Sequence, residues 1–300
     1  MNRLQLQTDF IDKFLDSNII QIANIQHREG PYYFPKHLHS NLEIYHILEG
    51  SCQMEIGNMC ISCIKGDFIM ILPNIAHSLT LSPEILCTFE HIHFSSVELT
   101  QISLEKYIGS PVTLLDALVY FFTSYYQVPS DSFLSNRICS IISEMENPAI
   151  FSQIQMNLQI LEILIHLLQS SDRDFSKLSL KYSTQNLYVL TALQYIEKNY
   201  ACKIQITDIA DEIHISPRYL NKIFSKYTHM SLLSYINVFR MNQAVKLMSN
   251  PSLTLAEIAS RVGMNDSQHF SRLFKDIMGS SPGQYRKTIN NEDLKVPKKI

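Results

Sequence analysis

Glycine is scarce in this sequence, with 8 residues in 300, and no long tract of proline, glycine or serine interrupts the chain. Disordered chains are poor in apolar residues, whereas 46% of this chain is hydrophobic. The composition therefore argues against a mainly disordered protein, and the length favours two or three packed domains.

Long apolar runs are missing as well. A membrane helix needs about 18–20 uninterrupted apolar residues. The longest candidate, ILEILIHLL, is shorter and contains Glu162 and His166. The opening stretch, MNRLQLQTDF, lacks the basic start and apolar core of a signal peptide. We therefore expect a soluble, cytoplasmic protein.

Cysteines and catalytic signatures are few. Six cysteines in 300 residues do not indicate a disulfide framework. Cys60 and Cys63 form a C-x-x-C pair, but side chains alternate along a strand, so we interpret the pair as apolar filling rather than a redox or zinc site. There is no G-x-S-x-G, P-loop or G-x-G-x-x-G pattern. We expect neither an enzyme nor a cofactor.

The net charge is only −3, but the two halves of the chain carry charge of opposite sign. Residues 1–186 contain 10 Lys and Arg against 19 Asp and Glu, whereas residues 187–300 contain 15 against 9. A basic half favours contact with a polyanion, so the C-terminal part is a candidate for nucleic-acid binding.

Residues from about 20 to 95 have the pattern of short strands, such as EIYHILEG and DFIMILP, separated by turn signals. The turn signals are Gly30-Pro31, Glu49-Gly50, Gly57-Asn58, Lys65-Gly66 and Pro73-Asn74. This rhythm predicts an antiparallel barrel or sandwich.

The pattern becomes helical from about residue 112, and one helix carries a seam of apolar residues at alternating spacings of three and four. The seam consists of Ile154, Leu158, Leu161, Ile165 and Leu168. Dimerisation through this helix and ordinary core packing both fit the spacing. Residues 171–186 are polar and rich in serine, which is typical of a linker.

Two similar helical units follow, at about 206–225 and 255–275. In each, a short amphipathic helix is followed by a turn and a capped second helix, which predicts a helix-turn-helix. Ser216 and Pro217 are suited to begin the first of these second helices, and Asp266 or Asn265 the other. Gly263 can supply a left-handed turn residue. The faces left exposed carry Arg, Lys, Asn, Gln and Ser, the residue types that contact bases and phosphates.

Residues 188–287 resemble the DNA-binding domain of the AraC/XylS family of transcription regulators. The stretch IADEIHISPRYLNKIFSK resembles the first unit of that domain, and EIASRVGMNDSQHFSRLFKDIMGSSPGQYR follows the more specific pattern of the second. The resemblance implies two helix-turn-helix units, joined by a long helix at about 232–249, that enter successive major grooves of double-stranded DNA. It also implies contact with RNA polymerase, and with the apolar seam described above we expect a homodimer.

Carried over by position, the resemblance assigns roles to ten residues. Base reading is assigned to Arg218, Asn221, Lys222, Ser267, Gln268, His269 and Arg272, and phosphate contact to Ser216, Ser271 and Lys275. Two positions depart from the family pattern. His229 stands where the first unit usually has glycine, and Met264 stands where the second usually has phenylalanine.

The stretches HLHSNLEIYHILEG and GDFIMILPNIAH are similar to the two motifs of the cupin barrel, H-x-H-x3-E-x6-G and G-x6-P-x3-H. In metal-binding cupins these motifs hold one ion, and the corresponding residues here are His37, His39, Glu43 and His77. Asn74 replaces the usual glycine before the last histidine. Lining of an organic-effector pocket without metal is therefore the interpretation we prefer, with a metal site as the alternative.

The candidate pocket residues are His37, His39, Glu43, Tyr45, His77, Phe89, His91 and His93. In FEHIHF the last three of these share one face of a strand. Imidazole and tyrosine side chains suit a polar effector such as a sugar, and a small barrel can enclose one such ligand.

These observations predict an α+β multidomain protein. The domains are a cupin-like β-barrel effector domain at 1–110, a helical dimerisation region at 111–170, a linker at 171–186, an all-α double helix-turn-helix domain at 187–290 and a polar tail at 291–300. We predict a sequence-specific transcription regulator, an activator by family analogy, that responds to a small-molecule effector. The alternatives are a metal-dependent cupin enzyme carrying a DNA-binding domain, and a constitutive DNA-binding protein whose barrel only dimerises.

Overall fold

The computed structural model describes residue 14 and residues 17–169, 173–178 and 180–292. None of the helices in this part of the chain is long and apolar enough to cross a membrane. The start of the predicted effector domain (residues 1–13, 15 and 16), three positions of the predicted linker (171, 172 and 179) and residues 293–300 of the predicted tail lie outside the described residues.

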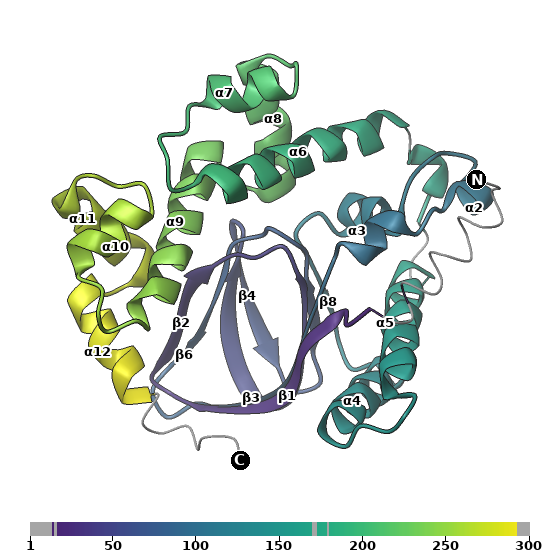
Figure 1. The fold of residues 1–300 in the computed structure, drawn as a ribbon. Helices are drawn as coiled ribbons and strands as arrows, with labels where there is room; N and C mark the ends of the chain where they lie inside the picture. Colours follow the sequence, from purple (N-terminus) through teal and green to yellow (C-terminus); the bar gives the residue numbers. More distant parts are fainter. Residues whose placement is uncertain (1–13, 15–16, 170–172, 179, 293–300) are drawn as a thin grey trace. The chain divides into compact units, whose positions relative to one another are not determined.

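Eight strands form one sheet in the N-terminal half of the chain (Figure 1). They are β1 (Ile20–Glu29), β2 (Tyr32–His37), β3 (Leu42–Ile56), β4 (Met59–Ile64), β5 (Phe68–Ile71), β6 (His77–Leu81), β7 (Leu86–Phe94) and β8 (Tyr125–Val128). The hydrogen-bonded path runs β1-β7-β3-β5-β8, β4 and β6 also pair with β3, and β2 pairs with β6. Among the described strands no pairing joins β1 to β8, so the predicted barrel is not closed.

Alternation along β3 and β7 gives the sheet an apolar face and a polar face. On the apolar face Ile44 pairs with Ile92, and both are fully buried. On the other face Glu43 pairs with His93, and residues two further along the strands pair likewise. The period of two thus gathers Glu43, Tyr45, His91 and His93 on the polar face, whereas the otherwise apolar face also holds the buried pair of His46 and Glu90.

The Glu49-Gly50 signal predicts a turn, but Gly50 lies inside β3. The pairing of β3 with β7 shifts register between Ile47 and Glu49, which marks a β-bulge. Gly50 has φ +76, and a Cβ there would lie 1.8 Å from the carbonyl oxygen of Leu86. Only glycine fits this bend. The other four turn signals lie between consecutive strands.

The helices that follow are η1 (Glu98–Gln101), α2 (Glu105–Ile108), α3 (Leu114–Phe122), α4 (Ser132–Glu146) and α5 (Ser152–Gln169). Thr113 and Asp116 form a capping box that begins α3. Helix α4 contacts β1 and β7, and α5 packs along α4 (Figure 1). The region 111–170, which the sequence pattern predicts as helical, also contributes β8, because its four residues pair with β5.

The chain forms two compact units, and the change between them falls between Asn186 and Leu187. Two short segments, Phe34–Leu38 and Ala76–Ser78, group with the second unit. Strand pairing nevertheless ties both to the sheet, because β2 pairs with β6 and β6 with β3.

The predicted linker is partly ordered into helix. A 3₁₀ turn, η2 (Phe175–Lys177), is followed by α6 (Leu180–Asn199), so the second part of 171–186 is helical. The guanidinium of Arg173 lies 4.3 Å from the ring centroid of Phe122 and 5.2 Å from that of Phe121. These cation–π contacts hold the segment against α3.

From Leu187 onwards the second unit is helical. After α6 come α7 (Ile206–Glu212), α8 (Pro217–Thr228), α9 (Leu232–Met248), α10 (Leu255–Arg261), α11 (Ser267–Met278) and α12 (Pro282–Glu292). Helices α9, α10 and α11 share a buried cluster that includes Met241, Ile258, Phe270 and Phe274. Helix α9 therefore connects two helix-turn-helix units, α7–α8 and α10–α11, and α8, α10 and α11 all pack against it.

Candidate nucleic-acid interface and ligand site

Helix α8 begins at a side-chain cap. The hydroxyl of Ser216 accepts a hydrogen bond from the backbone N–H of Tyr219 at 3.2 Å, and Pro217 occupies the first helical position. The cap satisfies a backbone donor that the helix leaves open, and proline loses nothing at this position.

Helix α11 begins at Asp266 rather than Asn265. The Asp266 carboxylate accepts hydrogen bonds from the backbone N–H groups of His269 at 3.1 Å and Gln268 at 2.9 Å. These bonds, that of His269 foremost, hold the pKa of Asp266 below its usual value. In the preceding turn Gly263 has φ +78, the left-handed conformation expected from the sequence.

The two units also close alike. The rings of Phe224 and Tyr235 meet edge to face with centroids 5.3 Å apart, and those of Phe274 and Tyr285 do so at 5.5 Å. Each contact ties the second helix of a unit to the helix that follows it. The spacing shared by these residues in the sequence is therefore a repeated packing contact.

The side chains predicted to contact DNA lie on or beside the second helices. Arg218, Lys222, Ser267, Gln268, His269 and Arg272 are exposed, and Asn221 is half-buried. Ser216, Ser271 and Lys275 are exposed as well. The opposite faces are buried, which leaves these polar faces turned to solvent. Contact with DNA stays a prediction.

The two departures from the family pattern are accommodated. His229 adopts the left-handed conformation, with φ +58, and its backbone N–H donates to the carbonyl oxygen of Ser225 at 3.0 Å. His229 therefore ends α8 in the same left-handed conformation in which Gly279, with φ +78, ends α11. Met264 is 7% exposed and packs in the core beside Phe270.

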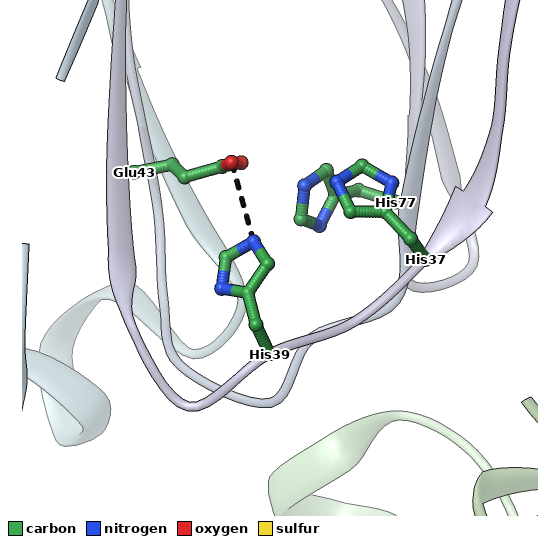
Figure 2. Close-up of side chains that lie close together, drawn as sticks. All are labelled: His37, His39, Glu43 and His77. Carbon is green, nitrogen blue, oxygen red and sulfur yellow. Dashed lines mark ion pairs between the residues drawn. The ribbon is translucent and has the colours of Figure 1, made fainter. Parts of the chain in front are cut away.

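Four residues of the sheet bring metal-ligating atoms together. One ligand atom each of His37, His39, Glu43 and His77 lies within 4.8 Å of the others. Figure 2 shows His37 and His77 side by side, facing His39 and Glu43. His37 is the last residue of β2 and His77 is the first residue of β6. His39 lies in the turn after β2, and Glu43 lies at the start of β3. Three imidazoles and a carboxylate form a donor set that divalent transition metals accept, so the residues fit such an ion.

The histidines of β7 join this group. Oε1 of Glu43, which is only 2% exposed, lies 3.2 Å from Nε2 of His39, 3.3 Å from Nε2 of His91 and 3.2 Å from Nε2 of His93. The hydroxyl of Tyr45 donates to Oε2 of Glu43 at 3.3 Å. Burial and the Glu43 charge hold the pKa of Tyr45 well above its usual value, so the phenol stays a donor.

Hydrogen bonds assign the tautomer of His91. Arg28 donates to Oε1 of Gln26 at 2.7 Å, so the amide nitrogen of Gln26 faces Nδ1 of His91 at 3.2 Å. The proton of His91 is then on Nε2, which donates to Glu43. His91 therefore orients the carboxylate of Glu43. Phe89, two residues before His91 on β7, packs against Tyr45 with ring centroids 5.5 Å apart.

The predicted dimerisation seam is exposed on α5 except at one end. Leu158 and Ile165 are 47% and 46% exposed, and Ile154 and Leu161 are partly exposed. Leu168 is instead 5% exposed and belongs to the core. A straight α-helix has 3.6 residues per turn, so residues spaced at an average of 3.5 gradually rotate around the helix and the last one faces the core. The sequence reasoning missed Phe151, 62% exposed and three residues before Ile154; its position just before the helix hid it from the helical pattern.

A group of buried thiols was also hidden in the sequence. Cys52 and Cys63 are paired across β3 and β4, and Cys87 is buried nearby in β7, whereas Cys60 is exposed. Hydrogen bonding with Cys63 and burial raise the pKa of Cys52 to about 12, so its thiol is unreactive at neutral pH.

Two family models cover most of the chain. Residues 22–168 match the model described as "AraC-like ligand binding domain", and residues 209–288 match the one described as "Helix-turn-helix domain". The first covers the sheet and the helices through α5, and the second covers both helix-turn-helix units.

Similar proteins agree with this division. The Msm operon regulatory protein of Streptococcus mutans is 26% identical over 292 residues, which cover 97% of this chain and 100% of that protein. The uncharacterized HTH-type transcriptional regulator YisR of Bacillus subtilis is 33% identical over 101 residues, 34% of this chain and 35% of that protein. The crystal structure of ToxT from Vibrio cholerae has a TM-score of 0.61 at 17% identity and covers 90% of this chain and 98% of that one. A ToxT structure with bound unsaturated fatty acid has a TM-score of 0.58 at 15% identity, over 90% and 95% of the two chains. At these identities ToxT shares the fold.

Proposed function

The chain belongs to the AraC/XylS family of transcription regulators, and from this membership we propose that it activates transcription when a small polar effector binds its sheet unit. It is a transcription regulator with a helix-turn-helix DNA-binding domain and an AraC-like ligand-binding domain. Activation rather than repression follows the family, as does contact with RNA polymerase.

The observation that carries the proposal is a capped helix with an exposed polar face that occurs twice. Helices α8 and α11 both begin at side-chain caps, bury Phe224 or Phe274, and expose basic and amide side chains. Two such helices joined through α9 suit successive major grooves, which recur about every 34 Å along DNA.

Base reading is divided between the helices by side-chain chemistry. Arg218, Lys222 and Arg272 suit the acceptors of guanine, and Asn221 and Gln268 suit adenine. The remaining base contacts are assigned to Ser267 and His269. Ser216, Ser271 and Lys275 contact phosphates and fix the register of the helices on the duplex.

We also propose that two copies pair through α5. The exposed stripe Phe151, Ile154, Leu158, Leu161 and Ile165 supports this, because an apolar seam at spacings of three and four suits a matching helix of a second chain. Pairing would place two DNA-binding units on adjacent half-sites. Residues 111–170 thus act in dimerisation and residues 187–290 in DNA binding.

The effector is assigned to the polar face of the sheet. Glu43, Tyr45 and His91 are linked there by hydrogen bonds, and such groups suit the hydroxyls of a sugar. An effector changes DNA binding only if it binds the active and inactive arrangements with different affinity.

Selection of bound DNA from a random pool tests the proposal. The full chain is used with and without a panel of sugars, and fatty acids form a separate arm. We expect an enriched site with paired half-sites and a change in occupancy with one sugar. Failure to enrich any sequence would contradict the DNA-binding role. Enrichment that responds only to fatty acids would contradict the polar effector.

A further inference from the structure

The loop between α6 and α7, residues 200–205, lies against the turn of the second helix-turn-helix unit. A Cβ added at Gly263 would stand 2.6 Å from the carbonyl oxygen of Tyr200 and 2.9 Å from that of Ala201. Two backbones approach this closely where one of them carries no side chain. The segment that leads into the first unit is therefore fitted directly to the second.

The left-handed conformation of Gly263 does not by itself require glycine. His214 takes the same conformation, with φ +58, and each of the two residues lies two positions after the end of the first helix of its unit. What differs at Gly263 is the α6–α7 loop, which leaves no room for a β-carbon. This glycine thus marks the contact between the loop and the second unit.

Arg240 on α9 holds the same loop. Its Nε donates to the carbonyl oxygen of Tyr200 at 2.9 Å, and its Nη2 donates to that of Cys202 at 2.7 Å. Hydrogen bonds from a charged group are stronger than neutral ones, and the planar fork of a guanidinium holds two acceptors in a fixed geometry. Arg240 therefore fixes the loop to the helix that joins the two units.

A row of aromatic rings continues from this loop to the second helix of the first unit. Ring centroids are 5.4 Å apart for Tyr200 and Phe239, 6.4 Å for Phe239 and Tyr235, and 5.3 Å for Tyr235 and Phe224 of α8. Aromatic pairs attract each other at such distances. Tyr200 also packs against the buried cluster of α9, α10 and α11. Packed side chains therefore run from α8 through the loop to the second unit.

We propose that Arg240 and the α6–α7 loop form a joint that fixes α8 and α11 relative to each other, and thereby sets the number of base pairs between the two DNA elements that these helices read. Arg240 is a positioning residue, because it acts through the loop. The inference rests on the proposed reading of DNA by both helices, but the joint can be measured without DNA.

The physical reason is the geometry of the duplex. Each base pair added between the elements moves one of them by about 3.4 Å along the axis and turns it by about 35° around the axis. A rigid joint cannot follow that change, so the DNA has to deform at an energetic cost. A loosened joint lets the protein follow instead.

The first experiment measures the distance between α8 and α11 in the full chain without DNA. Nitroxide labels are attached at Lys226→Cys and Asp276→Cys, which change exposed residues of the two helices. The exposed native cysteines are first changed to serine, and they are Cys60, Cys139 and Cys202. We expect double electron–electron resonance to give a narrow distance distribution for the native joint and a broader one for Arg240→Ala.

The second experiment measures binding to operators in which the two elements are moved apart or together by one base pair. We expect the native chain to prefer one spacing, and Arg240→Ala to reduce that preference by about threefold or more. Arg240→Lys keeps the charge but loses the fork, so it should relax the preference as well. The matched control is Arg261→Ala, which removes an exposed positive charge from the end of α10 and should leave the spacing preference unchanged.

Circular dichroism and thermal unfolding test whether each variant is folded, and Arg240→Lys takes the place of Arg240→Ala if the latter is not. Equal weakening at every spacing, as a mere loss of stability produces, overturns the proposal. An unchanged distance distribution in the Arg240 variants overturns it too. If the native chain selects no operator, the proposed function fails and the spacing role with it, while the distance distributions still decide whether the joint exists.

Discussion

Backbone carbonyl oxygens two residues away accept hydrogen bonds from Nδ1 of His37 and His39, and the side-chain amide of Gln26 donates one to Nδ1 of His91. The Asp266 carboxylate acts in the same local way at the start of α11, where it accepts from backbone N–H groups. At this scale, function depends on neighbours that prepare a side chain before any ligand or DNA arrives.

Removal of the Arg272 side chain should affect one base pair of the operator. Arg272 is exposed on α11, where a guanidinium can donate two hydrogen bonds to guanine. We expect Arg272→Ala to cost about 1–3 kcal/mol at its cognate base pair and to relax the preference there. Binding of the full chain to a set of single-substitution operators measures this.

Arg261→Ala is the control for Arg272. It removes the same exposed group from the end of α10, outside both second helices. If Arg272→Ala weakens binding to every operator equally, as loss of a phosphate contact does, the base-reading role is wrong.

The elements of the helical unit depend on how each helix begins and how each turn is made. Helices α7 and α10 are both seven residues long and α8 and α11 both twelve, but the turn of the second unit is one residue longer. The longer turn contains Gly263, whereas His214 takes the left-handed conformation in the shorter one.

A Gly263→Ala substitution should destabilise the second helix-turn-helix unit. Gly263 has φ +78, and a Cβ would lie 2.6 Å from the carbonyl oxygen of Tyr200. We expect a loss of about 1–3 kcal/mol, measured by denaturant unfolding. The control is Gly283→Ala, where nothing lies within 4 Å of the added Cβ. Equal stability of the two variants would refute the role assigned to Gly263.

Charges placed on the exposed stripe of α5 should prevent pairing of two chains. Leu158 and Ile165 are about half exposed, so Leu158→Glu with Ile165→Glu should leave the core intact and disfavour an apolar interface. We expect sedimentation velocity to show a dimer for the native chain and a monomer for the double variant. Leu233→Glu, on α9 and 62% exposed, is the matched control. A native monomer, or a variant that still dimerises, contradicts the proposal.

At the scale of the whole molecule, the two halves have opposite charge. Residues 187–300 carry an excess of six positive charges, whereas residues 1–186 carry an excess of nine negative ones. The basic excess favours association with DNA, and the acidic half contributes none of that attraction.

DNA binding by the full chain should therefore weaken steeply with salt. Lys and Arg that neutralise phosphates release counterions, so the logarithm of the binding constant falls linearly with that of the salt concentration. Lys275→Ala should reduce this slope by about 1 and weaken binding to all sequences alike. Fluorescence anisotropy over a salt series measures both. A slope that Lys275→Ala leaves unchanged would exclude a phosphate contact at Lys275.

Local patterns account for what could be predicted. Ser216, Pro217 and Gly263 are each read within a few neighbouring residues, and the caps and turn that they predict are found. Strand β8 was missed because four residues between helices carry too short a pattern, and only pairing with β5 makes them a strand. Gly50 looked like a turn because a bulge and a turn both call for a left-handed residue.

The sequence by itself determined the repeated helical unit, since caps, turn residues and apolar spacing act over short distances along the chain. Only the tertiary structure decided that His93 meets Glu43 and His39, because this contact joins β7 to residues about fifty positions earlier and depends on strand register. It also decided that Leu168 is buried while Leu158 is exposed, since packing against the rest of the unit chooses which side of α5 faces solvent.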